Sequence, residues 1–119
     1  MAGLYKGLKV WENSVNLIKN IYSVAEKLPK SEEYNLKQQL KRAVVSVALN
    51  IAEGKGRKSA KEFSNFLNIS FGSLCEVEAI LTLCQELNYL SNLEDTFSRI
   101  EVLLKMLSSL KNSLAEKQS

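Results

Sequence analysis

Histidine is absent from this 119-residue chain, and its absence removes the commonest general base, proton shuttle and metal ligand in proteins. A lysine or carboxylate nucleophile would need activation by its neighbours, and no residues in the sequence supply that activation. Glu76 and Glu78 cannot face the same way on one helix, so they predict neither a metal site nor an acid–base pair. We expect a protein that is not an enzyme and that uses no cofactor and no metal.

Cysteine is also scarce, with only two in the chain. Cys75 and Cys84 fall nine positions apart in one predicted helix, about 13 Å apart at the usual rise per residue, which is beyond the reach of a disulfide. We expect both to be small, buried or half-buried side chains.

Long hydrophobic runs are missing as well. No uninterrupted apolar stretch approaches the roughly 20 residues that span a bilayer, so we expect no contact with a membrane. The first seven residues have neither an apolar segment nor a cleavage site of small residues, so no secretory signal is predicted and a cytoplasmic location is expected. The length and the composition, with 45% hydrophobic and 24% charged residues, fit one globular domain.

Apolar residues that recur at steps of three and four predict an all-α domain over residues 1–119. The predicted helices cover residues 8–28, 34–53, 59–89 and 92–115. We expect Pro29 to end the first helix and Gly54 to end the second in a left-handed cap. Capping boxes are predicted where the third and fourth helices begin, at Ser59 with Glu62 and at Ser91 with Glu94. Short connections favour an antiparallel up-down-up-down four-helix bundle.

The second predicted helix carries a polar stripe beside its apolar one, at steps of three and four residues. Its members are Gln39, Arg42, Ser46, Asn50 and Glu53. A solvated face, a subunit interface and a small-molecule site all stay open for this stripe. Glu53 is expected to pair with Arg57 or Arg42, because the carboxyl end of a helix disfavours negative charge. In the third helix, Gly72 predicts the close approach of another helix. The predicted subunit interface therefore comprises Gln39, Ser46, Asn50, Glu53 and Gly72.

Positive charge is concentrated between residues 37 and 61, where seven cations and one carboxylate give a net charge of +6, against +3 for the whole chain. The loop Gly54–Ser59 leads into a helix amino terminus, where free N–H groups favour an anion, although its spacing is not that of a Walker loop. The cluster predicts contacts with RNA or DNA phosphates. The predicted nucleic-acid-binding residues are Lys41, Arg42, Lys55, Arg57, Lys58 and Lys61.

Two other interpretations of the cluster stay open: a solvated basic loop, and a docking surface for an acidic protein partner. The aromatic residues do not help to decide, because they recur at helical spacing and are not interleaved with the cations. We expect them to belong to the core and not to form a base-stacking platform. They are Trp11, Tyr22, Phe63, Phe66 and Phe71.

Several short motifs together resemble a known bacterial family, the four-helix-bundle proteins encoded in intervening sequences of 23S rRNA genes. The resemblance covers nearly the whole chain, and its most specific block runs from Asn50 to Ser59 with Glu62 and Phe63. Ala48 stands where the family pattern has a proline, so we expect a straighter second helix here. The motifs are Leu8–Trp11, Leu28–Lys30, Tyr34 with Leu36, Gln39–Ala43, Asn50–Gly54, Gly56–Ser59, Glu62–Phe63, Phe66–Leu67 and Gly72–Leu74 with Glu76.

The resemblance implies a cytoplasmic bundle that assembles as a cyclic homopentamer and has no established catalytic activity. It also implies kinship with the accessory variability determinant proteins of diversity-generating retroelements, which bind a reverse transcriptase and nucleic acid. Our leading hypothesis is therefore a non-enzymatic, self-associating bundle that binds nucleic acid. The alternative is a protein-interaction scaffold, or an accessory subunit of a reverse transcriptase, without nucleic-acid specificity of its own.

Overall fold

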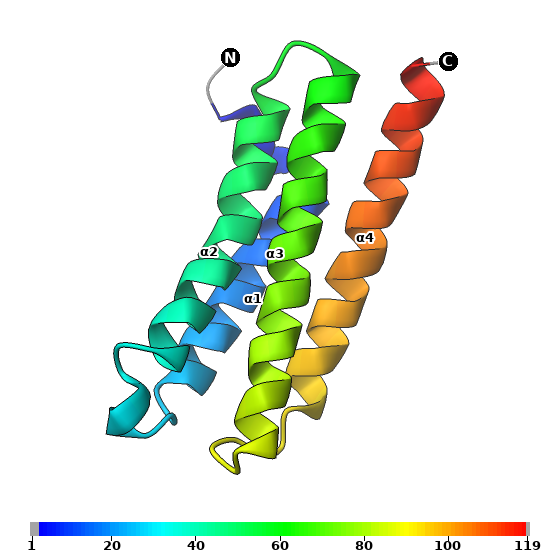
Figure 1. The fold of residues 1–119 in the computed structure, drawn as a ribbon. Coiled ribbons are helices and arrows are strands. Elements are labelled where there is room, and N and C mark those ends of the chain that lie inside the picture. The colour runs from blue at the N-terminus through cyan, green and yellow to red at the C-terminus, as the bar shows by residue number, and fades with distance from the viewer. Residues whose placement is uncertain (1–2, 119) are drawn as a thin grey trace.

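The computed structural model describes residues 3–118, which fold into four long helices (Figure 1). The helices are α1 (Lys9–Ala25), α2 (Leu36–Lys55), α3 (Ala60–Glu86) and α4 (Glu94–Gln118). Two short 3-10 helices, η1 (Leu4–Gly7) and η2 (Lys30–Glu32), precede α1 and α2. Residues 3–118 contain no strand, so the predicted all-α class is confirmed.

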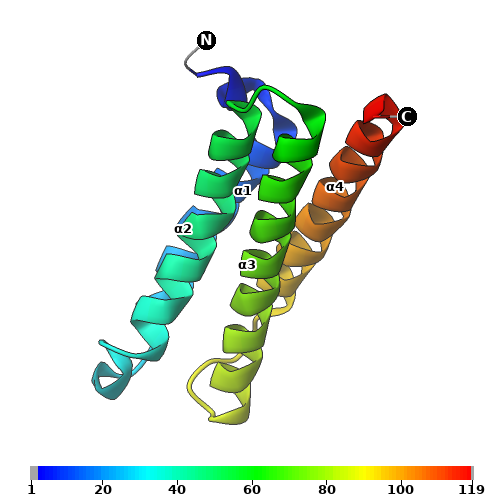
Figure 2. The ribbon, with the colours of Figure 1, turned by 45° about the horizontal axis from the view of Figure 1, so that its top comes forward.

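The helices alternate in direction and form an elongated bundle with principal extents of 48 × 24 × 19 Å. Each helix packs against the next one along the chain, and α4 closes the bundle against α1, so the four helices form a ring of neighbours. The carboxyl-terminal half of α4 diverges from α3 in both ribbon views (Figure 2). This is the predicted up-down-up-down arrangement. The alternation places the α2–α3 connection at the same end as the start of α1 and the end of α4.

The core is a single cluster of aliphatic side chains to which every helix contributes at the predicted helical spacing. Its largest fully buried members are Leu17, Ile21, Leu40, Val44, Val47, Ile51, Leu67, Leu74, Leu81, Ile100, Leu103 and Leu107. Few polar side chains are buried with them. Ser14 and Ser70 each donate a hydrogen bond to a backbone carbonyl, and Thr96 donates one to Asn20.

Small residues bring α2 and α3 close together. Gly54 is buried within α2, and a Cβ atom added there would lie 2.7 Å from the Cβ of Phe66 and 2.9 Å from Cδ1 of Phe63. The prediction of a left-handed cap at Gly54 is therefore wrong, because α2 continues to Lys55 and its glycine makes room for α3. Further along the same contact, the Ser70 hydroxyl donates to the Val47 carbonyl at 2.7 Å.

The helix termini differ from the predicted ones where the chain turns tightly. α1 ends at Ala25 and not at Pro29, since the next backbone bonds, Lys27 to Val24 and Leu28 to Ala25, span only three residues. Pro29 is extended and precedes η2, as expected for a residue that cannot donate a backbone hydrogen bond. α2 runs without interruption through Ala48, the position at which the family pattern has a proline.

The two predicted capping boxes have different outcomes. The Ser59 hydroxyl accepts a hydrogen bond from the backbone N–H of Glu62 at 3.1 Å, so the cap of α3 is confirmed. The cap at Ser91 is wrong, because α4 begins only at Glu94. Asn88 instead adopts a left-handed conformation (φ 62°), and the N–H of Tyr89 bonds back to the Cys84 carbonyl at 2.8 Å, which ends α3 in a Schellman-type turn.

The two cysteines have different environments. Cys84 is fully buried, and burial together with the nearby Glu32 carboxylate raises the pKa of its thiol. Cys75 is exposed, so the prediction that both side chains are at least half-buried is wrong for Cys75.

One described helix, α3, is long and apolar enough by length and composition to cross a membrane. A core helix of a bundle meets the same criterion, because one of its faces packs inside the protein. Only 33% of its most apolar stretch is buried, however, so α3 also presents apolar side chains on the outside of the bundle.

Candidate nucleic-acid interface

The antiparallel order separates charge between the two ends of the bundle. At the end that carries the α2–α3 loop, residues 3–13, 50–66 and 105–116 contain eight cations and four carboxylates, a net charge of +4. At the opposite end, residues 25–42 and 78–95 contain five cations and seven carboxylates, a net charge of −2. We call the first of these the basic end. Phosphate groups would be attracted to it and repelled from the other.

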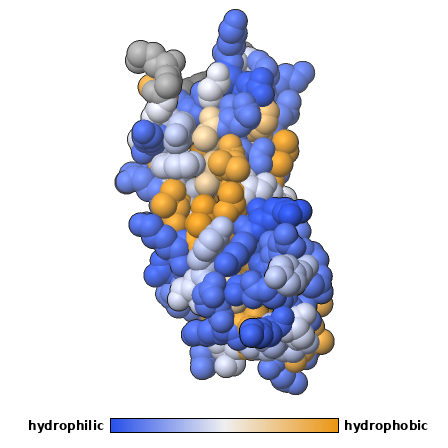
Figure 3. All heavy atoms as spheres, turned by 90° about the vertical axis from the view of Figure 1, so that its left-hand side faces the viewer, coloured by the Kyte–Doolittle hydropathy of each residue, from blue (hydrophilic) through white to orange (hydrophobic). Residues whose placement is uncertain are grey.

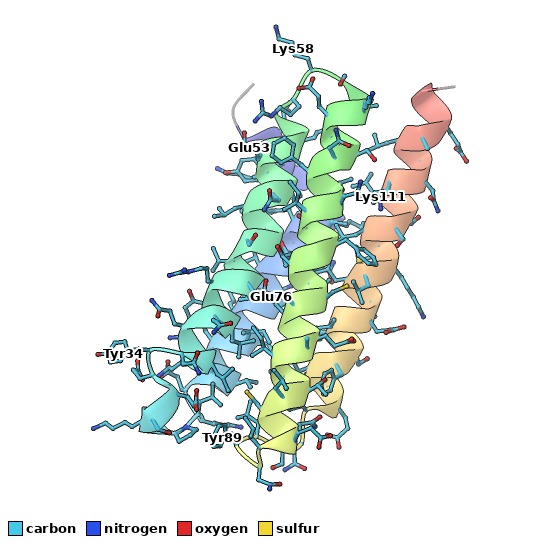
Figure 4. The ribbon with its side chains drawn as sticks, viewed as in Figure 1. Tyr34, Glu53, Lys58, Glu76, Tyr89 and Lys111 are labelled. Carbon is cyan, nitrogen blue, oxygen red and sulfur yellow. The ribbon has the colours of Figure 1, made fainter. Side chains whose placement is uncertain are left out.

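The α2–α3 loop forms the tip of the basic end. Lys58 points into solvent at the top of the molecule (Figure 4), and Lys61 is exposed on the first turn of α3. Neither lysine forms an ion pair within the part of the chain that is described. The adjacent Ser59 cap leaves other N–H groups of the first turn of α3 facing the same solvent. Both lysines are therefore available for phosphate.

Two aromatic rings lie directly beneath this loop, although the aromatic residues are not interleaved with the cations along the sequence. The Lys55 ammonium lies 5.8 Å from the centre of the Phe63 ring, and the Arg57 guanidinium lies 4.7 Å from the centre of the Phe66 ring. Phe63 is buried and Phe66 half-buried, so the rings belong partly to the core, as predicted, and partly to the surface. The sequence does not reveal these contacts, because the two cations precede α3 and the two rings belong to α3.

Glu53 pairs with Arg57, as expected from its place at the carboxyl end of α2. Arg57 Nη2 donates to Glu53 Oε2 at 3.1 Å, and both side chains remain about half exposed. The pair offsets the unfavourable interaction of Glu53 with the helix dipole. It also neutralises much of the charge that Arg57 would offer to a phosphate.

The six predicted nucleic-acid-binding residues do not form one cluster. Lys41 and Lys55 are both on α2, about 21 Å apart at 1.5 Å per residue, so Lys41 and Arg42 belong to the opposite half of the bundle. Lys41 is also occupied there, since its ammonium pairs with Glu26 at 3.1 Å and lies 4.7 Å from the centre of the Tyr22 ring. The basic end thus keeps Lys55, Arg57, Lys58 and Lys61 of the predicted set.

A partly buried ion network explains why Lys41 is held in place. Lys37, only 9% exposed, donates to Glu33 at 3.1 Å and to Glu26 at 3.2 Å, joining α1 to α2. Hydrogen bonds from Lys41 and then Lys37 lower the pKa of the Glu26 carboxyl, and hydrogen bonds to Glu33 and then Glu26 raise the pKa of Lys37. The network is structural and contributes nothing to the basic end.

The polar stripe on α2 finds most of its partners inside the chain. Asn50 Nδ2 donates to the Ser46 carbonyl at 2.9 Å, and the Ser46 hydroxyl shares a hydrogen bond of 2.9 Å with the Ser73 hydroxyl of α3. Gln39 donates to the Asn35 side chain at 2.9 Å. The stripe therefore does not need a second subunit to satisfy its polar groups, and the interface role of its residues stays a prediction.

Arg42 is the exception on the stripe. It is exposed and forms no ion pair among the described residues. It borders a groove of about 330 Å³ between α2 and α3, and Glu76 borders the same groove from α3 (Figure 4). Gly72, one turn before Glu76, is exposed, and no described atom outside the surrounding turns of α3 would lie within 4 Å of a methyl group added there. The expected close approach of another helix at Gly72 is therefore wrong within the protomer.

The residues that form an apolar outer surface on α2 and α3 were not identified from the sequence. Leu49 of α2 is 59% exposed, and Ile69 and Leu83 of α3 are 51% and 52% exposed. Figure 3 views the α2 side and shows apolar side chains gathered between hydrophilic regions above and below. The sequence does contain a signal for this surface. These three residues are apolar but do not belong to the series at steps of three and four residues that predicts the core. Such a surface is typical of a face that a partner covers.

Comparisons with known proteins agree with this fold. The family model described as 23S rRNA-intervening sequence protein matches residues 6–109. A crystal structure of a protein of unknown function from the S23 ribosomal protein family of Bacteroides thetaiotaomicron superposes with a TM-score of 0.79 at 24% sequence identity. The alignment covers 87% of this chain and 95% of that one, and at this identity the likeness shows the fold alone. No match was found among curated proteins.

Proposed function

The chain belongs to the 23S rRNA-intervening sequence protein family, and from that premise we propose that it is a non-enzymatic, self-associating bundle of the bacterial cytoplasm that binds nucleic-acid phosphates at its basic end. The observation that carries the proposal is the concentration of unpaired, exposed cations at the α2–α3 loop. Lys58 and Lys61 are free of ion pairs among the described residues, and the opposite end of the bundle carries net negative charge. A single loop binds phosphate weakly, but several copies in an assembly would bind one polynucleotide together.

Charge reversal at the loop tests the proposal. The double variant Lys58→Glu and Lys61→Glu is compared with Lys27→Glu and Lys30→Glu, which reverses two lysines at the other end that are exposed and form no ion pair in the described part of the chain. Binding of a labelled structured RNA is measured by fluorescence anisotropy at low salt. We expect the loop variant to lose on the order of tenfold or more in affinity and the control to lose little. Absence of binding by the unaltered protein, or equal losses in both variants, would contradict the proposal.

A protein partner is the alternative use of the same cations. An acidic partner such as a reverse transcriptase, which the family resemblance suggests, would bind the basic end by the same electrostatic attraction. Capture from lysate with and without nuclease separates the two functions. Capture of protein that survives nuclease treatment and depends on Lys58 and Lys61 would favour the scaffold; recovery of RNA or DNA that nuclease abolishes would favour nucleic-acid binding.

Self-association is the second part of the proposal, with the homopentamer of the family resemblance as the expected state. Its support is the apolar outer surface of α2 and α3, where Leu49 and Ile69 are more than half exposed in the isolated chain. The open space above Gly72 of α3 would admit a neighbouring helix. Covering these side chains would contribute roughly 25 cal/mol for each Å² of apolar surface removed from water.

Mass measurement by light scattering tests this part. We expect the unaltered protein to have several times the 13.4 kDa mass of one chain. Ile69→Glu should reduce the mass to that of a monomer, because it places a charge in the proposed contact. Val102→Glu is the control, since Val102 is equally exposed but belongs to α4. A strictly monomeric unaltered protein, or a lower mass in the control alone, would be inconsistent with the α2–α3 interface.

A further inference from the structure

Arg57 has a different environment from the other cations of the basic end. Its guanidinium lies 4.7 Å from the centre of the Phe66 ring, and Nη2 donates to Glu53 at 3.1 Å. Its backbone N–H donates to the Gly54 carbonyl at 3.0 Å, which fixes the start of the loop. The side chain is held by an aromatic ring and a carboxylate, yet it is still 42% exposed.

This arrangement suits base stacking better than phosphate binding. A guanidinium that is already paired with a carboxylate offers little net charge to a phosphate. Its plane remains available, because arginine is flat and stacks on aromatic faces, including those of unpaired bases. Phe66 lies against one side of the guanidinium. A base that stacks on the exposed side of the guanidinium would therefore add a third layer to an existing stack of two. Little side-chain entropy would be lost on binding.

The positive charge that would bind the backbone phosphates of such a strand lies next to Arg57. Lys58 follows it directly, and Lys61 is exposed on the first turn of α3. A polynucleotide whose phosphates contact these lysines would carry its bases past the loop. In a duplex, the bases already stack on one another and cannot reach the guanidinium without the energetic cost of being flipped out. In a single strand they are free to do so.

We propose that Arg57, held by Glu53 and Phe66, stacks on an unpaired base, and that the basic end therefore takes single-stranded RNA or DNA. This inference rests on the proposed nucleic-acid function. It adds a residue with a role that differs from that of the lysines: Lys58 and Lys61 attract any polynucleotide, and Arg57 selects those with unstacked bases.

The test uses three labelled probes on the whole protein: a single-stranded oligonucleotide, the same strand with abasic sites throughout, and a duplex of the same length. The variant Arg57→Lys keeps the charge and removes the plane. Arg99→Lys is a matched control, because Arg99 pairs with Asp95 at 2.8 Å in the same i, i+4 arrangement and is 48% exposed but stacks on no ring among the described residues. Circular dichroism confirms that each variant is folded.

We expect the unaltered protein to bind the single strand about fivefold or more tightly than the abasic strand, the gain from one stacked base. Arg57→Lys should abolish that difference and leave abasic binding unchanged, and Phe66→Leu should reduce it, whereas Arg99→Lys should preserve it. Equal binding of the two single strands by the unaltered protein, or equal losses on both strands in Arg57→Lys, would overturn the inference alone. Failure to bind any of the three probes would overturn the proposed function as well.

Discussion

At the scale of single residues, the two glycines that lie within α2 and α3 have opposite environments. Gly54 is buried where α2 touches α3, and a methyl group there would collide with Phe66. Gly72 is exposed on α3, and a methyl group there would meet no described atom within 4 Å outside the surrounding turns of its own helix. The sequence predicted neither environment, because Gly54 was expected to end the second helix and Gly72 to mark the close approach of another helix.

Alanine substitution distinguishes the two glycines. Gly54→Ala should lower the free energy of unfolding by about 1–3 kcal/mol, because overpacking outweighs the gain in helix propensity. Gly72→Ala should raise the free energy of unfolding of the single chain by up to about 1 kcal/mol, because only the propensity changes. Urea denaturation followed by circular dichroism measures both. A stabilised Gly54→Ala protein would show that α2 and α3 are not in close contact there.

At the scale of helices, the apolar periodicity predicted the four elements and the core because both follow from one cause, the burial of one face of each helix. The ends of the helices were predicted less well. Pro29 and Gly54 resemble local stop signals, whereas the observed ends depend on a three-residue turn after Ala25 and on the packing of Gly54 against Phe66. Packing between helices has no signature in the sequence of either helix alone.

Capping offers a direct comparison at this scale, since the sequence predicted two caps and the structure contains one of them. Ser59→Ala should lower the free energy of unfolding by about 1 kcal/mol, because the N–H of Glu62 loses its acceptor. Ser91→Ala should change it by only about a few tenths of a kcal/mol, because Ser91 lies outside α4. Thermal and urea unfolding of the two variants provide the measurement. Equal losses would mean that Ser91 does cap α4.

At the scale of the whole molecule, the basic cluster was only partly predictable. A charge count along the sequence takes no account of where the side chains lie in space. Lys41 and Lys55 are both on the 20-residue helix α2, and its rise separates them by about 21 Å. The antiparallel order then brings in cations from distant segments, such as Lys6 near the start of α1 and Lys111 near the end of α4, which no local count includes. The basic end is a property of the topology as well as of the loop.

The ion network between α1 and α2 makes stability depend on pH. Because the pKa of Glu26 is lower in the folded chain than its ordinary value of 4.5, the folded state keeps this carboxylate charged where the unfolded chain takes up a proton. The stabilisation is present above the ordinary pKa and is lost as the pH falls through the lowered one. For Lys37 the raised pKa gives stabilisation that is present below 10.5 and is lost as the pH rises through the raised value.

Glu26→Gln isolates the acid limb of this dependence. Between about pH 5 and pH 3 the free energy of unfolding should fall less steeply in the variant than in the unaltered protein. The reason is that the variant lacks the carboxylate that takes up a proton when the chain unfolds. Glu101→Gln, at an exposed position of α4 with no ion pair among the described residues, is the control and should follow the unaltered curve. Identical slopes for the Glu26 variant and the unaltered protein would contradict the assignment.

The salt dependence of binding tests the central claim, that Lys58 and Lys61 contact nucleic-acid phosphates. Each phosphate contact contributes about 0.7 to the slope of log affinity against log salt for a single strand. The double variant Lys58→Gln and Lys61→Gln should therefore reduce the slope by about 1.4, while Lys27→Gln and Lys30→Gln leave it unchanged. An unchanged slope in the loop variant, or the same reduction in both variants, would contradict the account.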